Sequence, residues 1–409
     1  MNPATNPFAP GAGTQPPELA GRKAILDAAS IALARVKNGR SARSQMLLGL
    51  RGVGKTVLLN RLVEFAETEG YLTIYLEAPE DRRLAEMLVQ PLRSTLFRLS
   101  RVEQARAVAL NALAVLRNFA TGFKVAVGDI EFIVEEEKGT ADSGDIETDL
   151  PEVFLAVARA AQGAGKAVAL FIDEVQYLQQ QDLAALIVSI HRVNQKGLPL
   201  LVFGAGLPQL AALAGEAKSY AERLFDFPEV GPLTGVAARS AIRTPIQKEG
   251  AQISDEALEF ILQLTAGYPY FLQEWGSHAW NVATASPITV QDVEVATVQA
   301  RARLEHGFFR VRLDHLTPRE TAYVRAMAEL GPGPHRSGDI AQKLGISVTS
   351  AAPLRGGLIK KGMIYSPQHG DTAFTVPLFD EFMLRSMPHW IPGAATELNR
   401  KKNRKGRQN

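Results

Sequence analysis

The chain contains no cysteine among its 409 residues. Disulfide bonds and thiolate metal sites are therefore excluded. Its seven histidines show no H-x-x-x-H pair or similar spacing that would indicate a metal site on a helix. No apolar run approaches the ~20 residues that a membrane-spanning helix needs. These absences exclude disulfide-rich, zinc-thiolate and helical membrane proteins.

An excess of charge of one sign is also missing, because 45 Lys and Arg oppose 43 Asp and Glu. The resulting net charge of +2 does not indicate a nucleic-acid-binding protein. The exception is the C-terminal end, where basic side chains crowd residues 400–407. We expect residues 391–409 to form a basic tail that is either solvated and disordered or in contact with phosphate.

The first residues, 1–16, are rich in Pro, Gly, Ala and Asn, which predicts a flexible lead. They contain neither the basic region nor the apolar region of a signal peptide. With a hydrophobic content of 46%, the remainder is long enough for two or three domains with real cores. We therefore expect a soluble, cytoplasmic, multidomain protein.

The most informative segment is Gly49–Thr56, which fits the P-loop pattern G-x-x-x-x-G-K-[ST] at every position. A short apolar run precedes it, and a helical apolar pattern follows it. A glycine loop between a strand and a helix N-terminus directs backbone N–H groups and the helix dipole at phosphate. Lys55 would neutralise the β- and γ-phosphates and Thr56 would hold Mg²⁺. The residues predicted to bind the nucleotide here are Gly49, Leu50, Arg51, Gly52, Val53, Gly54, Lys55 and Thr56.

Strand and helix patterns alternate from residue 17 to residue 233, which predicts an α/β core with a parallel sheet. Pro91 interrupts a long helical pattern over 84–119, so we expect a kink or two helices there. Alternating residues in 123–134 indicate a small hairpin, and residues 135–148 an exposed acidic loop. Helical patterns alone over 234–312 predict an all-α region.

Two carboxylates end the buried strand pattern Val168–Ile172. The carboxyl ends of parallel strands lie at the edge where the P-loop opens, so Asp173 would reach Mg²⁺ through water. Glu174 would orient and polarise the attacking water. A P-loop followed by this pair predicts ATP hydrolysis rather than phosphate binding alone.

These segments resemble the AAA+ ATPases, most closely the branch of archaeal-type ATPases and origin-recognition initiators, with ties to the STAND signalling ATPases. Residues 16–22 look like the stretch that borders the adenine in these families, which implies nucleotide contacts for Leu19, Gly21 and Arg22. Residues 171–178 look like their Walker-B stretch. Gly267-Tyr268-Pro269 is similar to the G-x-P of their helical lid, which implies that Pro269 packs near the nucleotide.

Two features depart from the family pattern. The strand pattern Leu200–Phe203 runs into Gly204-Ala205-Gly206, so no side chain there can report on the γ-phosphate. Arg223 lies where the family often places an arginine finger, which stabilises charge on the ATP of a neighbouring subunit. The alternative is a surface arginine paired with a nearby carboxylate. We therefore expect slow hydrolysis, with nucleotide-dependent homo-oligomers if Arg223 acts as a finger.

The last region, 313–390, shows three short helical patterns and then a hairpin, which is the order of a winged helix-turn-helix domain. In such a domain the third helix enters the major groove of double-stranded DNA. The expected DNA contacts are Thr349, Ser350, Arg355, Lys360 and Lys361. Winged helices also dock on proteins, so a DNA-associated ATPase and a STAND-like switch with a protein-docking winged helix both remain open.

Overall fold

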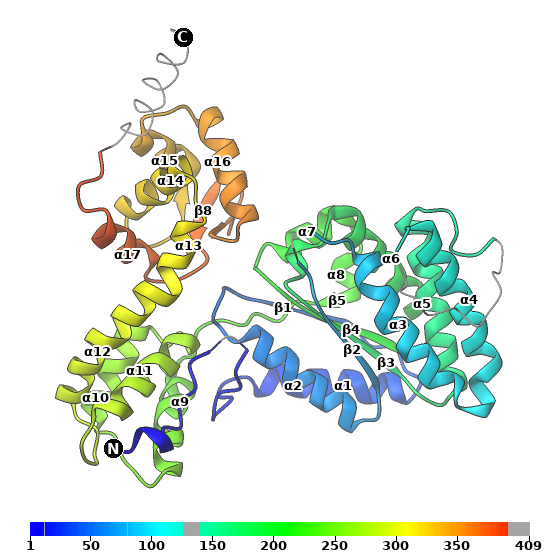
Figure 1. Cartoon of the computed structure of the whole chain (residues 1–409), viewed down its shortest axis with the longest axis horizontal. Coiled ribbons are helices and arrows are strands. Elements are labelled where there is room, and N and C mark those ends of the chain that lie inside the picture. Colours follow the sequence, from blue (N-terminus) through cyan, green and yellow to red (C-terminus); the bar gives the residue numbers. More distant parts are fainter. Residues whose placement is uncertain (12, 80, 126–138, 392–409) are drawn as a thin grey trace. The chain divides into compact units, whose positions relative to one another are not determined.

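A computed structural model of the chain describes residues 1–11, 13–79, 81–125 and 139–391. The chain divides into two compact units (Figure 1). The core unit comprises Ala20–Gly49 and Val53–Gly231. The C-terminal unit comprises Met1–Leu19, Leu50–Gly52 and Pro232–Asn409. Among the described residues, no helix is long and apolar enough to cross a membrane.

The core unit is built on a five-stranded sheet in the order β2-β3-β4-β1-β5. The strands are β1 (Ser44–Leu48), β2 (Leu72–Glu77), β3 (Val168–Asp173), β4 (Leu200–Gly206) and β5 (Phe225–Asp226). All paired neighbours run parallel. Every residue of β3 and β4 is buried, as expected for central strands that helices cover on both faces. The predicted α/β class and parallel sheet are confirmed.

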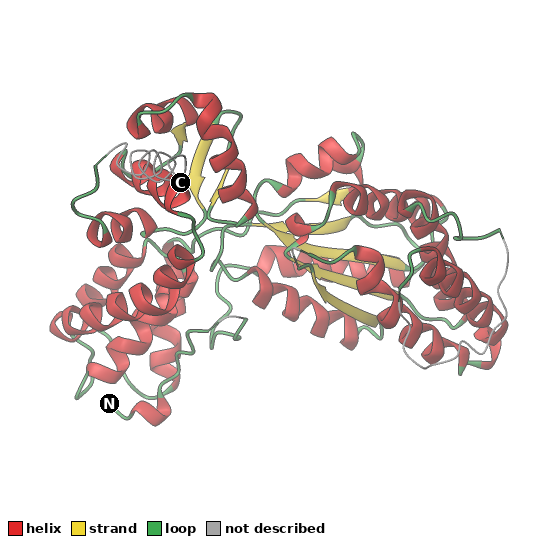
Figure 2. Ribbon diagram, turned by 45° about the horizontal axis from the view of Figure 1, so that its top comes forward, coloured by secondary structure: helices red, strands yellow, loops and turns green. Residues whose placement is uncertain are grey.

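Two sets of helices cover the sheet (Figure 2). On one face lie α1 (Lys23–Lys37) and α2 (Lys55–Thr68). The other helices of the unit are α3 (Leu84–Ser100), α4 (Arg106–Gly122), α5 (Ile146–Gly163), α6 (Gln180–Gln195), α7 (Leu210–Ala217) and α8 (Ala221–Leu224). Leu170 and Ile172 of β3 join a large apolar core with α3–α6. Phe171, on the opposite face of the same strand, stacks on Phe203 with 5.1 Å between the ring centroids.

The long helical pattern over 84–119 is divided into two helices, as predicted, but the division lies after Ser100 and not at Pro91. Pro91 is inside α3, which continues to Ser100. The chain then passes through a short 3-10 helix, Glu103–Ala105, before α4 begins. A proline removes one backbone donor from a helix, and the burial of Leu88, Leu92 and Leu96 on α3 holds the helix together across it. The predicted hairpin over 123–134 falls largely outside the described residues.

The first part of the C-terminal unit is helical, as predicted. It contains α9 (Gly235–Lys248), α10 (Asp255–Thr265), α11 (Pro269–Val282), α12 (Val290–Leu304), a π-helical turn (Glu305–Phe309) and α13 (Arg310–Asp314). The expected caps are present: the Ser254 side chain accepts from the Ala257 N–H, and Thr289 and Asp292 form a capping box. Local sequence therefore determines where α10 and α12 begin.

The second part contains four helices and a small sheet. The elements are α14 (Pro318–Glu329), β6 (His335–Arg336), α15 (Ser337–Leu344), α16 (Val348–Lys360), β7 (Ile364–Tyr365), β8 (Asp371–Phe374) and α17 (Phe379–Ser386). The sheet is antiparallel in the order β6-β8-β7. The three helices and the hairpin agree with the sequence prediction, whereas β6 and α17 are additional.

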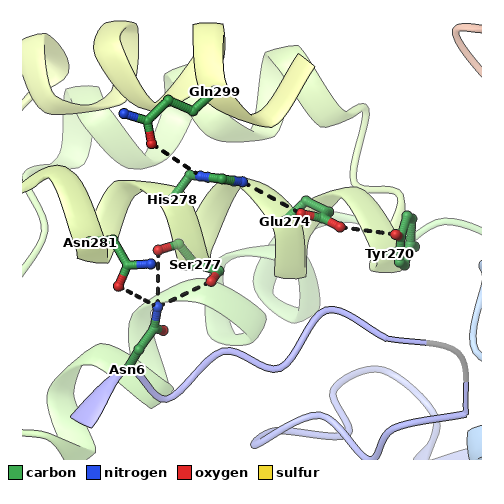
Figure 3. Close-up of polar contacts among 7 residues, drawn as sticks. All are labelled: Asn6, Tyr270, Glu274, Ser277, His278, Asn281 and Gln299. Atoms are coloured by element: carbon green, nitrogen blue, oxygen red, sulfur yellow. Dashed lines mark hydrogen bonds and ion pairs between the residues drawn. The ribbon is translucent and has the colours of Figure 1, made fainter. Parts of the chain in front are cut away.

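The N-terminal segment is not the flexible lead that its composition predicts. The side-chain amide of Asn6 donates to the Ser277 carbonyl oxygen at 3.0 Å and to Asn281 Oδ1 at 2.9 Å, both on α11 (Figure 3). Phe8 is 5% exposed, and its ring occupies the space above Gly276. Trp280 Nε1 donates to the Asn2 carbonyl oxygen at 2.9 Å. One aromatic anchor and side-chain hydrogen bonds order the segment in spite of its composition.

Candidate nucleotide-binding site

The P-loop connects β1 to α2. Gly54 caps α2 with φ +92°, a conformation that favours glycine. At Gly49 a Cβ atom would lie 2.2 Å from the Val230 carbonyl oxygen, so a side chain is excluded there by contact. The Gly49 N–H donates to the Gly206 carbonyl oxygen at 3.1 Å. The loop therefore starts from a backbone position fixed by β4 and by the segment after β5.

The two halves of the predicted magnesium site meet directly. Thr56 Oγ1 donates to Asp173 Oδ2 at 2.6 Å, although the residues lie 117 positions apart in the chain. Asp173 is only 3% exposed at the end of β3, and Lys55 is 6% exposed at the start of α2. A hydroxyl and a carboxylate are hard oxygen donors of the kind that Mg²⁺ prefers. These residues fit the metal that the sequence predicts.

Asp173 has two further partners. Its Oδ1 accepts from the Glu174 N–H at 2.8 Å, and its Oδ2 accepts from the Tyr75 hydroxyl at 3.3 Å. Burial, and then the charge of Asp173, raise the pKa of Tyr75, so its hydroxyl stays protonated and donates. Tyr75 belongs to no sequence motif and was not predicted. The parallel register of β2 with β3, Tyr75 opposite Phe171, places it near this carboxylate.

Glu174, the predicted water-orienting carboxylate, adopts a left-handed backbone conformation with φ 53° and ψ 39°. This region is unusual for a residue with a side chain and is often found at functional sites. Gln176 Nε2 donates to Glu174 Oε2. The carboxylate is therefore held by a neighbour that the sequence motifs do not single out.

Arg22 supports the P-loop from the preceding segment. It is 8% exposed, and its guanidinium donates to the Val53 carbonyl oxygen at 3.2 Å and to that of Gly231. Burial lowers the pKa of Arg22, since desolvation disfavours the charged form. Leu19 is half-buried and Gly21 has φ +70° in the same stretch. The contacts of Arg22 are with the loop backbone, and an adenine contact stays a prediction.

Within the C-terminal unit, residues 50–52 contact the start of α11. The Tyr270 N–H donates to the Gly52 carbonyl oxygen at 3.1 Å, and the Tyr268 hydroxyl donates to that of Arg51. Pro269 is the first residue of α11. The Gly-x-Pro motif is therefore next to residues 51 and 52 of the P-loop sequence, and the packing of Pro269 near the nucleotide stays a prediction. Arg51 takes part in this arrangement through its carbonyl oxygen, and a nucleotide contact of Leu50 stays a prediction.

Two other predicted residues have clear positions. Arg223 is exposed on α8, immediately before β5, and its role as a finger stays a prediction. The end of β4 carries no polar side chain, since Gly206 is its last residue. The side-chain oxygen of Gln176 instead accepts from the Leu207 N–H at 3.1 Å.

The predicted DNA contacts separate into two groups, one hydrogen-bonded within the fold and one exposed. Arg355 Nε donates to Thr372 Oγ1 at 2.9 Å, and Lys361 Nζ donates to Glu320 Oε2 at 2.7 Å. Arg355 therefore stabilises the hairpin, and Lys361, the residue after α16, stabilises the start of α14. Thr349, Ser350 and Lys360 are exposed on α16. This second group is the more exposed one, and contact with DNA stays a prediction for all five residues.

The sheet, the P-loop and the Thr56–Asp173 pair define a P-loop ATPase. Residues 18–203 match the family model described as AAA ATPase domain, and residues 306–383 match one described as a domain of unknown function (DUF8462). The chain therefore contains an AAA ATPase domain, and the protein is an ATPase.

Two known proteins are similar over most of the chain. A Walker-type ATPase of Pyrococcus abyssi superposes with a TM-score of 0.57 and 17% identity, covering 90% of this chain and 97% of the other. This similarity shows a shared fold. An uncharacterized HTH-type transcriptional regulator of Methanocaldococcus jannaschii is 22% identical over 363 residues, which are 82% of this chain and 80% of the relative.

Proposed function

We propose that the protein hydrolyses ATP with Mg²⁺ and couples its nucleotide state to the binding of double-stranded DNA through a C-terminal winged helix. The observation that carries the proposal is the 2.6 Å hydrogen bond between Thr56 and Asp173, with Glu174 next in the chain. It joins the phosphate loop to the acidic strand end, which is the arrangement that phosphoryl transfer to water requires.

The reaction follows from these side chains. Backbone N–H groups of 52–56 and the N-terminus of α2 bind the phosphates, and Lys55 neutralises the charge on the β- and γ-oxygens. Thr56, and Asp173 through water, would hold Mg²⁺, which would supply positive charge to stabilise the transferring phosphoryl group. Glu174 accepts the proton of a water that attacks the γ-phosphorus as the bond to the β-phosphate oxygen breaks. The products are ADP and inorganic phosphate.

For the C-terminal unit we propose a winged helix over 313–390, with α16 as the DNA-facing helix. The order of three helices and a hairpin supports this, as does similarity to a relative named as an HTH-type regulator. Thr349, Ser350 and Lys360 are the proposed contacts. An exposed Arg223 supports a further proposal, that ATP assembles homo-oligomers in which this arginine reaches a neighbour's phosphates.

One observation favours a second candidate, a nucleotide switch whose winged helix docks on protein. The exposed face of α16 presents Ala352, Pro353 and Gly356, with Lys360 at its end. Few positive charges there mean few phosphate contacts and a weak salt dependence of DNA binding.

The test measures ATPase rate and oligomeric state together, with and without duplex DNA, for the wild type, Lys55→Ala and Glu174→Gln. DNA-stimulated turnover that both substitutions abolish, with Glu174→Gln held as an ATP-bound assembly, is the expected result. Nucleotide binding without turnover and without a response to DNA would instead support the protein-docking switch.

A further inference from the structure

Gln176 has both ends of its side-chain amide engaged in the core unit. Its Oε1 accepts from the Leu207 backbone N–H at 3.1 Å. Because a backbone N–H can only donate, the atom facing Leu207 must be the amide oxygen. The Nε2 group must then face the other way, where it donates to Glu174 Oε2. The orientation of this amide is therefore determined by the main chain.

The far end of this bridge lies next to the P-loop. Leu207 follows Gly206, the last residue of β4. The Gly206 carbonyl oxygen accepts from the Gly49 N–H at 3.1 Å. A continuous set of contacts therefore runs from the Glu174 carboxylate through the Gln176 amide and the end of β4 to the first residue of the P-loop.

The glycine at the end of β4 leaves room for this bridge. A Cβ atom at Gly206 would lie 2.8 Å from Gln176 Oε1 and 2.8 Å from Leu210 Cδ2. Gly206 has no positive φ among the described backbone angles, so the glycine is explained by space and not by conformation. The space beside Gly206, where β4 has no polar side chain, is thus occupied by the amide of Gln176 from the segment after β3.

We propose that Gln176 is a positioning residue that orients the Glu174 carboxylate toward the attacking water and ties its orientation to the end of β4 and the P-loop. A hydrogen bond to an ionised acceptor is stronger than one between neutral groups. It fixes Oε2 and leaves Oε1 to accept from water. This inference rests on the proposed hydrolysis, in which Glu174 accepts the proton.

Two substitutions separate this role from a purely structural one. Gln176→Glu keeps an oxygen for the Leu207 N–H but replaces the donor to Glu174 by a second carboxylate. Gln176→Met has similar length and loses both bonds. We expect kcat to fall roughly 10- to 100-fold in both, because the water-orienting group is misplaced, while the Kd for ATP is unchanged. Gln179→Met, an exposed glutamine three positions on, is the matched control.

The split between kcat and the Kd for ATP supplies the second readout, because a merely structural loss would change both. The carboxylate that Gln176→Glu introduces repels the Glu174 carboxylate and displaces it from the attacking water, while it keeps an acceptor for the Leu207 N–H. Gly206→Ala displaces the Gln176 amide from the other side, and we expect it to lower kcat as Gln176→Met does.

The wild type and Glu174→Gln are assayed in parallel. If the wild type turns over, Glu174→Gln does not, and Gln176→Glu matches the wild type in kcat, the positioning role is overturned and the proposed hydrolysis stands. The positioning role is also overturned if either substitution at Gln176 raises kcat. If the wild type shows no turnover, or Glu174→Gln keeps it, the proposed hydrolysis fails and the inference fails with it. Native-like thermal unfolding of the variants confirms that loss of kcat is not loss of fold.

Discussion

The acidic strand end of the core unit and helix α16 of the C-terminal unit both contain charged or polar side chains that the sequence predicts to be functional. In the core unit, Thr56 Oγ1 donates to Asp173 Oδ2 at 2.6 Å, at the end of β3. Arg355 on α16 and Lys361, the residue after it, instead donate to Thr372 of the hairpin and to Glu320 of α14. A motif at a fixed position relative to a strand determines where its side chains lie. The position of a basic residue on or next to a short helix does not, because such a residue can bond to the rest of its domain instead of to a ligand.

The largest effect in this comparison is expected at Asp173. Asp173→Asn removes the charge that faces Thr56 and the proposed Mg²⁺, so kcat should fall on the order of 100-fold or more. Tyr75→Phe removes a donor to the same carboxylate oxygen and should change kcat only a few-fold. Steady-state ATPase assays over a range of Mg²⁺ concentrations measure both. Equal effects of the two substitutions would mean that the carboxylate serves the fold and not the reaction.

A second prediction concerns Phe8 in the N-terminal segment. Phe8→Ala empties the space above Gly276 and should lower the free energy of unfolding of the C-terminal unit by about 3 kcal/mol. Phe8→Leu refills part of that space and should cost less. Urea unfolding followed by fluorescence measures the change. An unaltered midpoint for Phe8→Ala would restore the flexible lead that composition predicts.

The third prediction tests whether Lys361 serves the fold. Burial opposes ionisation of Glu320, but hydrogen bonds from Lys361 and from Thr317 lower its pKa below the ordinary 4.5. A lowered pKa stabilises the folded state above the unfolded carboxyl pKa, and this stabilisation is lost as pH falls through the folded value. Lys361→Met should therefore cost about 1–2 kcal/mol at pH 7. The difference from the wild type should shrink below about pH 4. Unfolding at several pH values measures it, and a constant difference would exclude Glu320 as the partner.

The smallest effect is expected for the binding of DNA when Lys360 is replaced. Lys360→Ala should reduce the slope of log affinity against log salt by about one, without changing stability, because one exposed cation is lost. Arg355→Ala should lower the melting temperature through its lost bonds to Thr372 and Asp371 and leave the slope unchanged. The reverse result, a changed slope and normal melting for Arg355→Ala, would return Arg355 to the DNA-facing set.

The sequence predicts the core well at positions where a residue type has a single local role, such as a glycine of the P-loop or a helix cap. The Gly49–Thr56 pattern, the strand ending at Asp173 and the caps at Ser254 and Thr289 each follow from local chemistry, and the structure has all of them. The parallel sheet follows from the alternation of strands and helices. These features needed no knowledge of distant contacts.

Features that depend on tertiary register were not predictable. Gln176 matters because the end of β4 presents Leu207 N–H beside it, and no sequence pattern relates the two. The faces of α16 could not be assigned, because the helix has only two buried residues, Ala351 and Leu358, to mark its inner side. The docking of Phe8 depends on a glycine 268 positions later, since only Gly276 leaves room for the ring.

The hydrogen bond from Trp280 to Asn2 has a spectroscopic consequence. All three tryptophans of the chain, at 275, 280 and 390, belong to the C-terminal unit, and the core unit has none. Tryptophan emission, excited selectively, therefore reports on one unit only, and Trp280 senses whether the N-terminal segment is attached. A single tryptophan introduced into the core unit would give it a separate optical signal, so that the melting of the two units could be followed independently in one sample.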